Sequence, residues 1–119
     1  MSRAEIDVSG TRLDWTMTQG DKFVWEVTVL DPDEGTVLDI TGYTFEMDVA
    51  LAPGQTALAS ATVTLTDPTN GVVEFEFADT ATATFVGRNH YDMQYSDDLG
   101  DGPWTIYWGW FTARADVTA

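Results

Sequence analysis

Residues 44–51 read Thr44-Phe45-Glu46-Met47-Asp48-Val49-Ala50-Leu51, and this stretch decides the fold class. From Phe45 onward every second residue is large and apolar, and two of the residues between them are acidic. A period of two is that of a β-strand with one face in a core and the other in water, as in an antiparallel sheet. An amphipathic helix would instead repeat its apolar residues three and four positions apart.

The same alternation recurs along most of the chain. We expect about seven short strands, near residues 23–30, 36–38, 44–51, 61–66, 72–78, 91–96 and 104–111, with turn-rich segments between them. The dipeptide Asn70-Gly71 predicts a hairpin of the strands 61–66 and 72–78. One short helical turn is expected near residues 79–85. Numerous short strands favour an all-β sandwich or barrel.

Length and composition predict one domain with a single core. The chain has 119 residues, of which 44% are hydrophobic and 13% aromatic, and the large aromatic side chains supply much of the apolar area that a core needs. We therefore expect residues 1–119 to form a single β-sandwich domain, with residues 1–17 as an extended arm or a first strand. We expect neither a secretory signal nor a membrane helix, because no long apolar run is present.

The charge of the chain argues against two classes of partner. Twenty acidic residues against five basic ones give a formal net charge of −15. The basic residues are scattered along the sequence, as Arg3, Arg12, Lys22, Arg88 and Arg114. Since phosphate groups are bound by clustered Lys and Arg, we expect no binding to nucleic acid or to an anionic membrane.

The sequence offers only ambiguous carboxylates for catalysis, and we expect that the protein is not an enzyme. His90 is the one His and Cys is absent, so a thiolate nucleophile and a zinc site of several His or Cys ligands are excluded. The pairs Glu46/Asp48 and Glu74/Glu76 alternate on polar strand faces, which explains them without a catalytic dyad. The acidic loops 31–34 and 97–101 have turn composition. We expect no catalytic residue, metal or cofactor, while Ca²⁺ binding by these loops stays open.

The aromatic strand near the end of the chain is the candidate interface. The alternation places Trp104, Trp108 and Trp110 on one side and Tyr107 and Phe111 on the other. A strand that is apolar on both sides is covered on both faces, and a neighbouring subunit is one possible cover because aromatic residues are enriched at interfaces. Two alternatives stay open: a central strand within this one domain, and stacking of sugars on exposed Trp rings.

Three residues mark structural turns. Gly42 follows Thr41 at a turn that leads into the strand 44–51, and a positive φ is expected there. Asn70 and Gly71 form the turn of the predicted hairpin.

The order of these segments resembles a phage family. The segments that carry the resemblance are Thr18-Gln19-Gly20-Asp21-Lys22-Phe23, Val37-Leu38-Asp39-Ile40-Thr41-Gly42-Tyr43, Gly71-Val72-Val73-Glu74-Phe75-Glu76-Phe77, Asp79-Thr80-Ala81-Thr82, Tyr91-Asp92-Met93-Gln94-Tyr95 and a closing strand with Gly109. They resemble the small β-sandwich at the N-terminus of phage baseplate upper proteins and in small phage structural proteins. The likeness covers about residues 18–118.

The resemblance implies an immunoglobulin-like antiparallel β-sandwich that docks into a tailed-phage virion component such as a baseplate, neck, tail or fibre attachment. Other virion proteins and copies of the chain itself are the implied partners, and the protein would be made in the host cytoplasm and found in the virion. Baseplate upper proteins continue into a long C-terminal part beyond this likeness, so an adaptor or a capsid decoration protein stays open. A module that binds a carbohydrate or a host-surface ligand is the alternative function.

Overall fold

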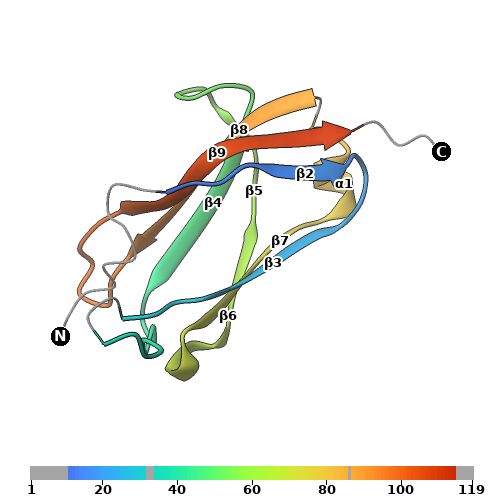
Figure 1. The fold of residues 1–119 in the computed structure, drawn as a ribbon. Helices are drawn as coiled ribbons and strands as arrows, with labels where there is room; N and C mark the ends of the chain where they lie inside the picture. Colours follow the sequence, from blue (N-terminus) through green and yellow to red (C-terminus); the bar gives the residue numbers. More distant parts are fainter. Residues whose placement is uncertain (1–10, 32–33, 86, 115–119) are drawn as a thin grey trace.

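The computed structural model describes residues 11–31, 34–85 and 87–114, which form nine strands and one short helix (Figure 1). The strands are β1 (Thr11–Arg12), β2 (Trp15–Thr18), β3 (Phe23–Thr28), β4 (Thr44–Ala50), β5 (Ala57–Ser60), β6 (Thr62–Asp67), β7 (Val72–Phe77), β8 (Gly87–Ser96) and β9 (Trp104–Arg114). The helix is α1 (Asp79–Thr82), and a 3₁₀ turn, η1 (Pro68–Asn70), joins β6 to β7.

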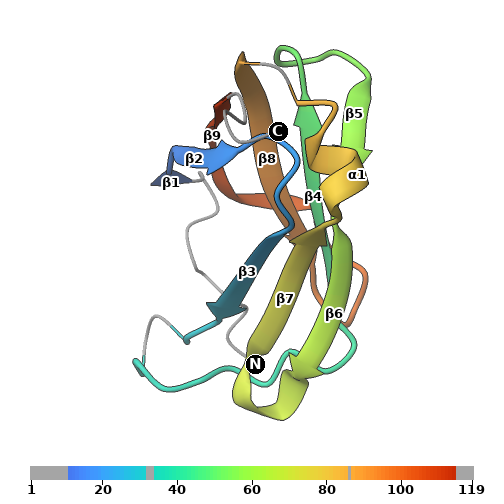
Figure 2. The same cartoon turned by 90° about the vertical axis from the view of Figure 1, so that its right-hand side faces the viewer.

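The strands form two sheets that pack face to face (Figure 2). The large sheet has the order β1-β9-β8-β4-β5, with β2 also paired to β9, and the small sheet has the order β3-β7-β6. An immunoglobulin domain divides its strands in the same way, with B, E and D in one sheet and G, F and C in the other. The predicted sandwich is therefore confirmed, and in this comparison β3 takes the place of strand B and β9 that of strand G.

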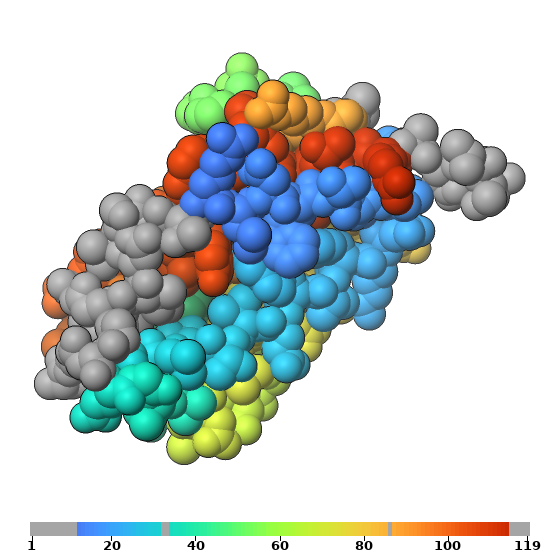
Figure 3. Space-filling model, viewed as in Figure 1, coloured from blue at the N-terminus to red at the C-terminus, as the bar shows by residue number. Residues whose placement is uncertain are grey.

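The first strands depart from the antiparallel pattern. β1 and β2 both run parallel to β9, from the pair Thr11 and Tyr107 to the pair Thr18 and Arg114. The space-filling view shows this blue segment lying along the red β9, with β3 beneath it (Figure 3). Of the predicted arm or first strand of residues 1–17, the part from residue 11 onward belongs to these strands, and residues 1–10 lie outside the described residues.

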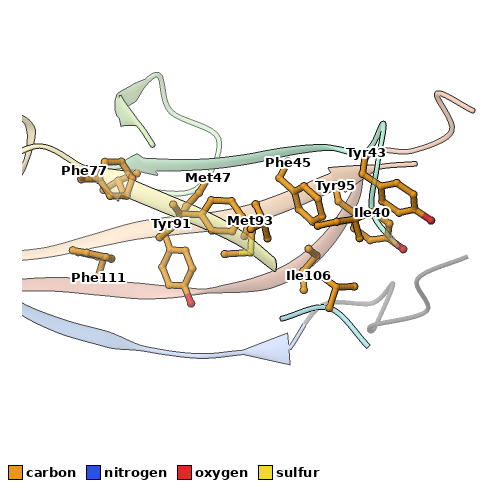
Figure 4. Close-up of a cluster of buried hydrophobic side chains, with 14 of the residues drawn as sticks. Ile40, Tyr43, Phe45, Met47, Phe77, Tyr91, Met93, Tyr95, Ile106 and Phe111 are labelled. Carbon is orange, nitrogen blue, oxygen red and sulfur yellow. The ribbon is translucent and has the colours of Figure 1, made fainter. Parts of the chain in front are cut away.

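One hydrophobic core fills the space between the sheets. Figure 4 shows side chains of β4, β7, β8 and β9 meeting in it. Its buried apolar residues are Met17, Val29, Leu38, Ile40, Tyr43, Phe45, Met47, Val49, Val73, Phe75, Phe77, Phe85, Tyr91, Met93, Tyr95, Ile106, Phe111 and Ala113. The inward positions of β4, β7 and β8 are those that the period-two pattern predicts, since successive side chains of a strand point to opposite faces.

The predicted hairpin and the predicted helical turn are both present. β6 and β7 pair as an antiparallel hairpin, and α1 lies within the range 79–85. β5 was not predicted, because its sequence Ala57-Leu58-Ala59-Ser60 lacks the alternation of large apolar and polar residues that marks a half-buried strand.

A bulge in β9 changes which side its first residues face. Tyr107 pairs with Met93, but Thr105 pairs with the next residue of β8, Gln94, so Ile106 is an extra residue in β9. After this bulge the predicted alternation holds. Before it, the parity is reversed, and Trp104 faces the same side as the buried Ile106 and not the side of Trp108. The prediction that the three Trp residues share one side is therefore wrong for Trp104.

Candidate interaction site

Three of the five predicted interface residues pack in the core or against it. Phe111 is completely buried, in contact with the rings of Phe77 and Phe85. Trp104 and Tyr107 are partly buried against the core, and the ring of Trp104 lies 5.3 Å from that of Tyr95. Phe111 is therefore a core residue, while Trp104 and Tyr107 pack against the core and are half-buried.

The other two, Trp108 and Trp110, lie on the outer face of the large sheet with three cationic or titratable side chains. The guanidinium carbon of Arg88 is 3.9 Å from the ring centroid of Trp110, and that of Arg12 is 5.7 Å from the ring of Trp108. His90 lies between them, with its ring 5.5 Å from that of Trp110 and 6.5 Å from that of Trp108. We call these five residues the aromatic–cation cluster.

The fold assembles this cluster from three strands that are distant in the sequence. Cross-strand pairing sets His90 of β8 opposite Trp110 of β9, and parallel pairing sets Arg12 of β1 opposite Trp108. The sequence pattern treated the basic residues as scattered, and the signal that was missed is that Arg88 and His90 share one face of β8. Cations over Trp rings are attracted by the negative face of the π-system, so the cluster is held in place before any partner binds.

Asp14 fastens the first strands beside the cluster. Its Oδ1 accepts a hydrogen bond of 3.0 Å from the backbone N–H of Trp110, and its Oδ2 lies 3.2 Å from Nη2 of Arg12. The hydrogen bond from Trp110 and the contact with Arg12 both favour the charged form, and they lower the pKa of Asp14 below its usual value. This carboxylate supplies an acceptor for β9 at the point, between β1 and β2, where backbone pairing with β9 is interrupted.

A hollow adjoins the cluster on the same face. It has a volume of about 360 Å³ and is lined by Asp48, Ala50, Ala52, Pro53, Gly54, Gln55, Ala57, His90 and Asp92. Burial raises the pKa of the Asp92 carboxyl, and the nearby carboxylate of Asp48 adds to this effect. The hollow is therefore polar and acidic, while the cluster beside it is aromatic and basic.

Two of the other acidic candidates, Asp97 and Glu76, have partners within the fold. Within the described residues no three His, Asp or Glu side chains come together in a way that could hold a metal ion. In the loop 97–103, Oδ1 of Asp97 accepts hydrogen bonds from the backbone N–H groups of Leu99 and Asp101, which is the usual role of an Asp in a turn. Glu76 forms an ion pair of 3.1 Å with Lys22.

No helix among the described segments has the length and apolar character needed to cross a membrane.

The turn residues have the expected backbone geometry. Gly42 has φ of +86° and Gly71 has φ of +75°, both in the left-handed region that favours glycine. The side chain of Asn70 donates a hydrogen bond to Oδ2 of Asp67 across the same turn.

Comparison with solved structures finds a similarity in fold. A solved structure described as the N-terminal domain of phage TP901-1 ORF48 superposes with a TM-score of 0.50, covering 87% of this chain and 85% of that one. The chain shares its fold with a phage protein domain. The aligned sequences are 14% identical. The resemblance to the N-terminal domain of phage baseplate upper proteins, expected from the order of segments, is thus confirmed at the level of the fold.

Sequence comparison adds nothing to this similarity. No protein-family model matches the chain. No curated protein matches it either. What the residues of the outer face do must therefore be argued from their own geometry and chemistry.

Proposed function

We propose that this chain is a non-enzymatic structural or assembly module of a tailed-phage virion, acting as one β-sandwich domain over residues 1–119. The observation that carries the proposal is the shared fold with the phage TP901-1 ORF48 domain, which extends over most of both chains. A baseplate, neck, tail or fibre adaptor and a capsid decoration protein are the positions that such a module fits. Its partners are other virion proteins, and neither nucleic acid nor a membrane is among them.

The aromatic–cation cluster is the surface that docks. Trp and Arg are the residues most often found at the energetic centre of protein interfaces, and here both types lie together on the outer face of the large sheet. Trp108 is 36% exposed, so a partner can still bury part of its ring. The acidic remainder of the surface repels partners that are themselves acidic, which restricts binding to the correct orientation.

Gold labelling of purified phage particles, with an antibody raised against the recombinant protein, tests the virion assignment. Gold at one end of the tail supports a baseplate or fibre adaptor, and gold on the capsid supports a decoration protein. Unlabelled particles that contain the other structural proteins would contradict the proposal.

A double variant tests the docking surface. Trp108→Ala with Trp110→Ala should lower incorporation of the protein into particles at least tenfold, because each Trp at the centre of an interface contributes about 1–2 kcal/mol or more. Leu99→Ala is the matched control, since Leu99 is 80% exposed but lies in the loop 97–103, away from the cluster. Both proteins should have folded circular dichroism spectra. Equal incorporation of the double variant would show that the docking surface lies elsewhere.

The hollow beside the cluster favours a second candidate function, the binding of a carbohydrate or host-surface ligand. It sets Gln55 and two carboxylates, Asp48 and Asp92, next to the cluster, and binding sites for polar ligands combine such polar groups with aromatic rings. A glycan screen with and without Ca²⁺ tests this candidate. A signal that Trp108→Ala and Asp92→Asn both remove would favour ligand binding over assembly, and an empty screen would reject it.

A further inference from the structure

One long stretch of this acidic chain carries no charge. The sequence contains 20 acidic and five basic residues, but none of either lies between Val49 and Thr66. The side chains in this stretch are mainly Ala, Thr and Leu. A charge-free stretch of this length is a surface that a like-charged molecule can approach, provided that the fold keeps it together.

The fold does keep it together, along one side of the sandwich. The stretch forms β5 and β6, and each is the last strand of its sheet. The chain passes from the large sheet to the small one at Ala61, whose N–H donates a 2.8 Å hydrogen bond to the carbonyl of Met47. Figure 2 shows β5 above β6 on the right-hand side, away from β1, β2 and β3. One side of the molecule is therefore formed by two edge strands whose one charged residue is Asp67, at the end of β6.

The edges elsewhere carry the features that prevent edge-to-edge pairing. Charged side chains and bulges are the usual protection of an edge strand. β3 contains Glu26, and Arg12 and Asp14 lie along the edge formed by β1 and β2. β6 ends in Asp67, and its pairing with β7 shifts register between Thr64 and Asp67.

β5 lacks the charges of the other edges, although it also has a bulge, because its pairing with β4 shifts register at Leu58. Its four residues include neither a charge nor a proline, and Leu58 is 39% exposed. Leu51, in the loop that precedes it, is 55% exposed. An edge strand without charges presents unpaired N–H and C=O groups to another strand, and exposed leucines beside it add apolar area to such a contact.

We propose that β5 pairs antiparallel with β5 of a second copy of this chain about a twofold axis, joining the two large sheets into one. A second copy fits because it presents the same uncharged strand, which adds no charge to the repulsion between two chains of net charge −15. The twofold axis sets Leu58 beside the partner's Leu58, as a self-complementary interface requires. This inference rests on topology and charge, and it stands or falls separately from the virion proposal.

Sedimentation velocity over a range of protein concentrations tests the pairing. We expect a weak dimer that strengthens when NaCl is added, because salt screens the repulsion between the acidic copies. Leu58→Glu should abolish the dimer by setting two carboxylates side by side, while Leu99→Glu, which adds the same charge in an exposed loop, should retain it. A mixture of Leu58→Glu and Leu58→Lys proteins should form a heterodimer, because the new charges then attract.

Three results would each contradict the pairing through β5. A chain that stays monomeric at every concentration and salt level overturns the inference, even if gold labelling places the protein on particles. A dimer that Leu58→Glu leaves intact also overturns it, and shows that another face, such as the aromatic–cation cluster, pairs the copies. A dimer that weakens with salt would indicate ion pairs and would equally contradict pairing through an uncharged strand.

Discussion

Gly42 and Gly71 share a left-handed backbone but not the space around it. A Cβ added at Gly42 would meet Cβ of Asp98 at 3.2 Å, on a side chain of an exposed loop. A Cβ added at Gly71 would lie 2.6 Å from the carbonyl oxygen of Val29 and 2.7 Å from that of Leu38. These oxygens belong to the backbone, and the carbonyl of Val29 also accepts a hydrogen bond from the N–H of Leu38, so they cannot move aside without loss.

The loss in the free energy of unfolding on substitution by alanine should therefore depend on the atoms that surround each glycine. Gly20→Ala is the control, since Gly20 also has φ of +86° but no atom within 4 Å of an added Cβ. It should lower the free energy of unfolding by roughly 1–2 kcal/mol, the cost of the left-handed backbone alone. Gly42→Ala should cost slightly more. Gly71→Ala should cost about 2–5 kcal/mol, because the steric conflict adds to the backbone strain. Urea unfolding measures all three, and equal losses would contradict the ranking.

At the scale of single residues, the sequence predicted the turns but not how much stability a substitution in each turn would remove. Asn70-Gly71 is a recognisable turn signal, so the positive φ of Gly71 was predictable. Its contact with the segment around Val29 depends on how the hairpin packs against a distant part of the chain, and no local pattern encodes it.

Among the elements, β1 and β2 are held to β9 by side chains as well as by the backbone. The N–H of Leu13 donates to the carbonyl of Trp108, and the hydroxyl of the buried Tyr91 donates to the carbonyl of Leu13. A Cβ at Gly109 would lie 2.6 Å from both the carbonyl oxygen of Leu13 and Oδ1 of Asp14. Gly109 therefore allows the first strands to approach β9 closely, which is one of the two roles that a glycine inside a strand commonly has.

Substitutions of Asp14 should loosen this edge. Asp14→Ala removes the acceptor for the N–H of Trp110 and should lower the urea midpoint at pH 7, while Asp14→Asn keeps an oxygen acceptor and should lower it less. The pKa of Asp14 is lower in the folded protein than in the unfolded chain. The charge of Asp14 therefore stabilises the fold above the unfolded pKa of about 3.9, and this stabilisation is lost as pH falls through the folded pKa. The difference between the wild type and Asp14→Asn should then shrink in acid.

A second carboxylate provides the control for net charge. Asp98 is exposed in the loop 97–103, so Asp98→Asn removes one negative charge far from the first strands. If Asp98→Asn and Asp14→Asn shifted the midpoint equally, the effect of Asp14 would be one of net charge and not of its hydrogen bond. A difference between Asp14→Asn and the wild type that persisted at low pH would contradict the assignment as well.

Elements with a polar face and an apolar face were predictable, and the others were not. β4, β7 and β8 alternate in sequence because they separate core from water, so the period of two revealed them. β5 has one large side chain, Leu58, among small ones, so it shows no alternation. The parallel pairing of β2 with β9 depends on contacts between segments far apart in the sequence. The bulge at Ile106 reversed the side of Trp104, since nothing in an aromatic-rich strand marks the extra residue.

For the whole molecule, charge is the dominant property. A net charge of −15 on a small domain repels itself and opposes the compact state. Raising NaCl from about 0.02 M to about 0.5 M shortens the screening length severalfold and should raise Tm by several degrees. Differential scanning calorimetry in NaCl and in KCl measures this effect. The same rise in both salts indicates screening, whereas an unchanged or lower Tm would show that self-repulsion does not limit stability.

The candidate site also belongs to this scale, and the sequence predicted only part of it. The aromatic strand drew attention to Trp108 and Trp110, but only the folded sheet shows that Arg12, Arg88 and His90 surround them. Residues from three strands meet there through pairing register, which the sequence alone does not specify.

The parallel pairing of β2 with β9 has a mechanical consequence. A force that draws the start of β1 and the end of β9 in opposite directions acts along both strands, because the strands run the same way. The load is then shared by the hydrogen bonds between them, which must rupture together. A hairpin pulled apart at its two ends opens one bond after another. A module attached to one neighbour through β1 and to another through the end of β9 would therefore resist a pulling force between them.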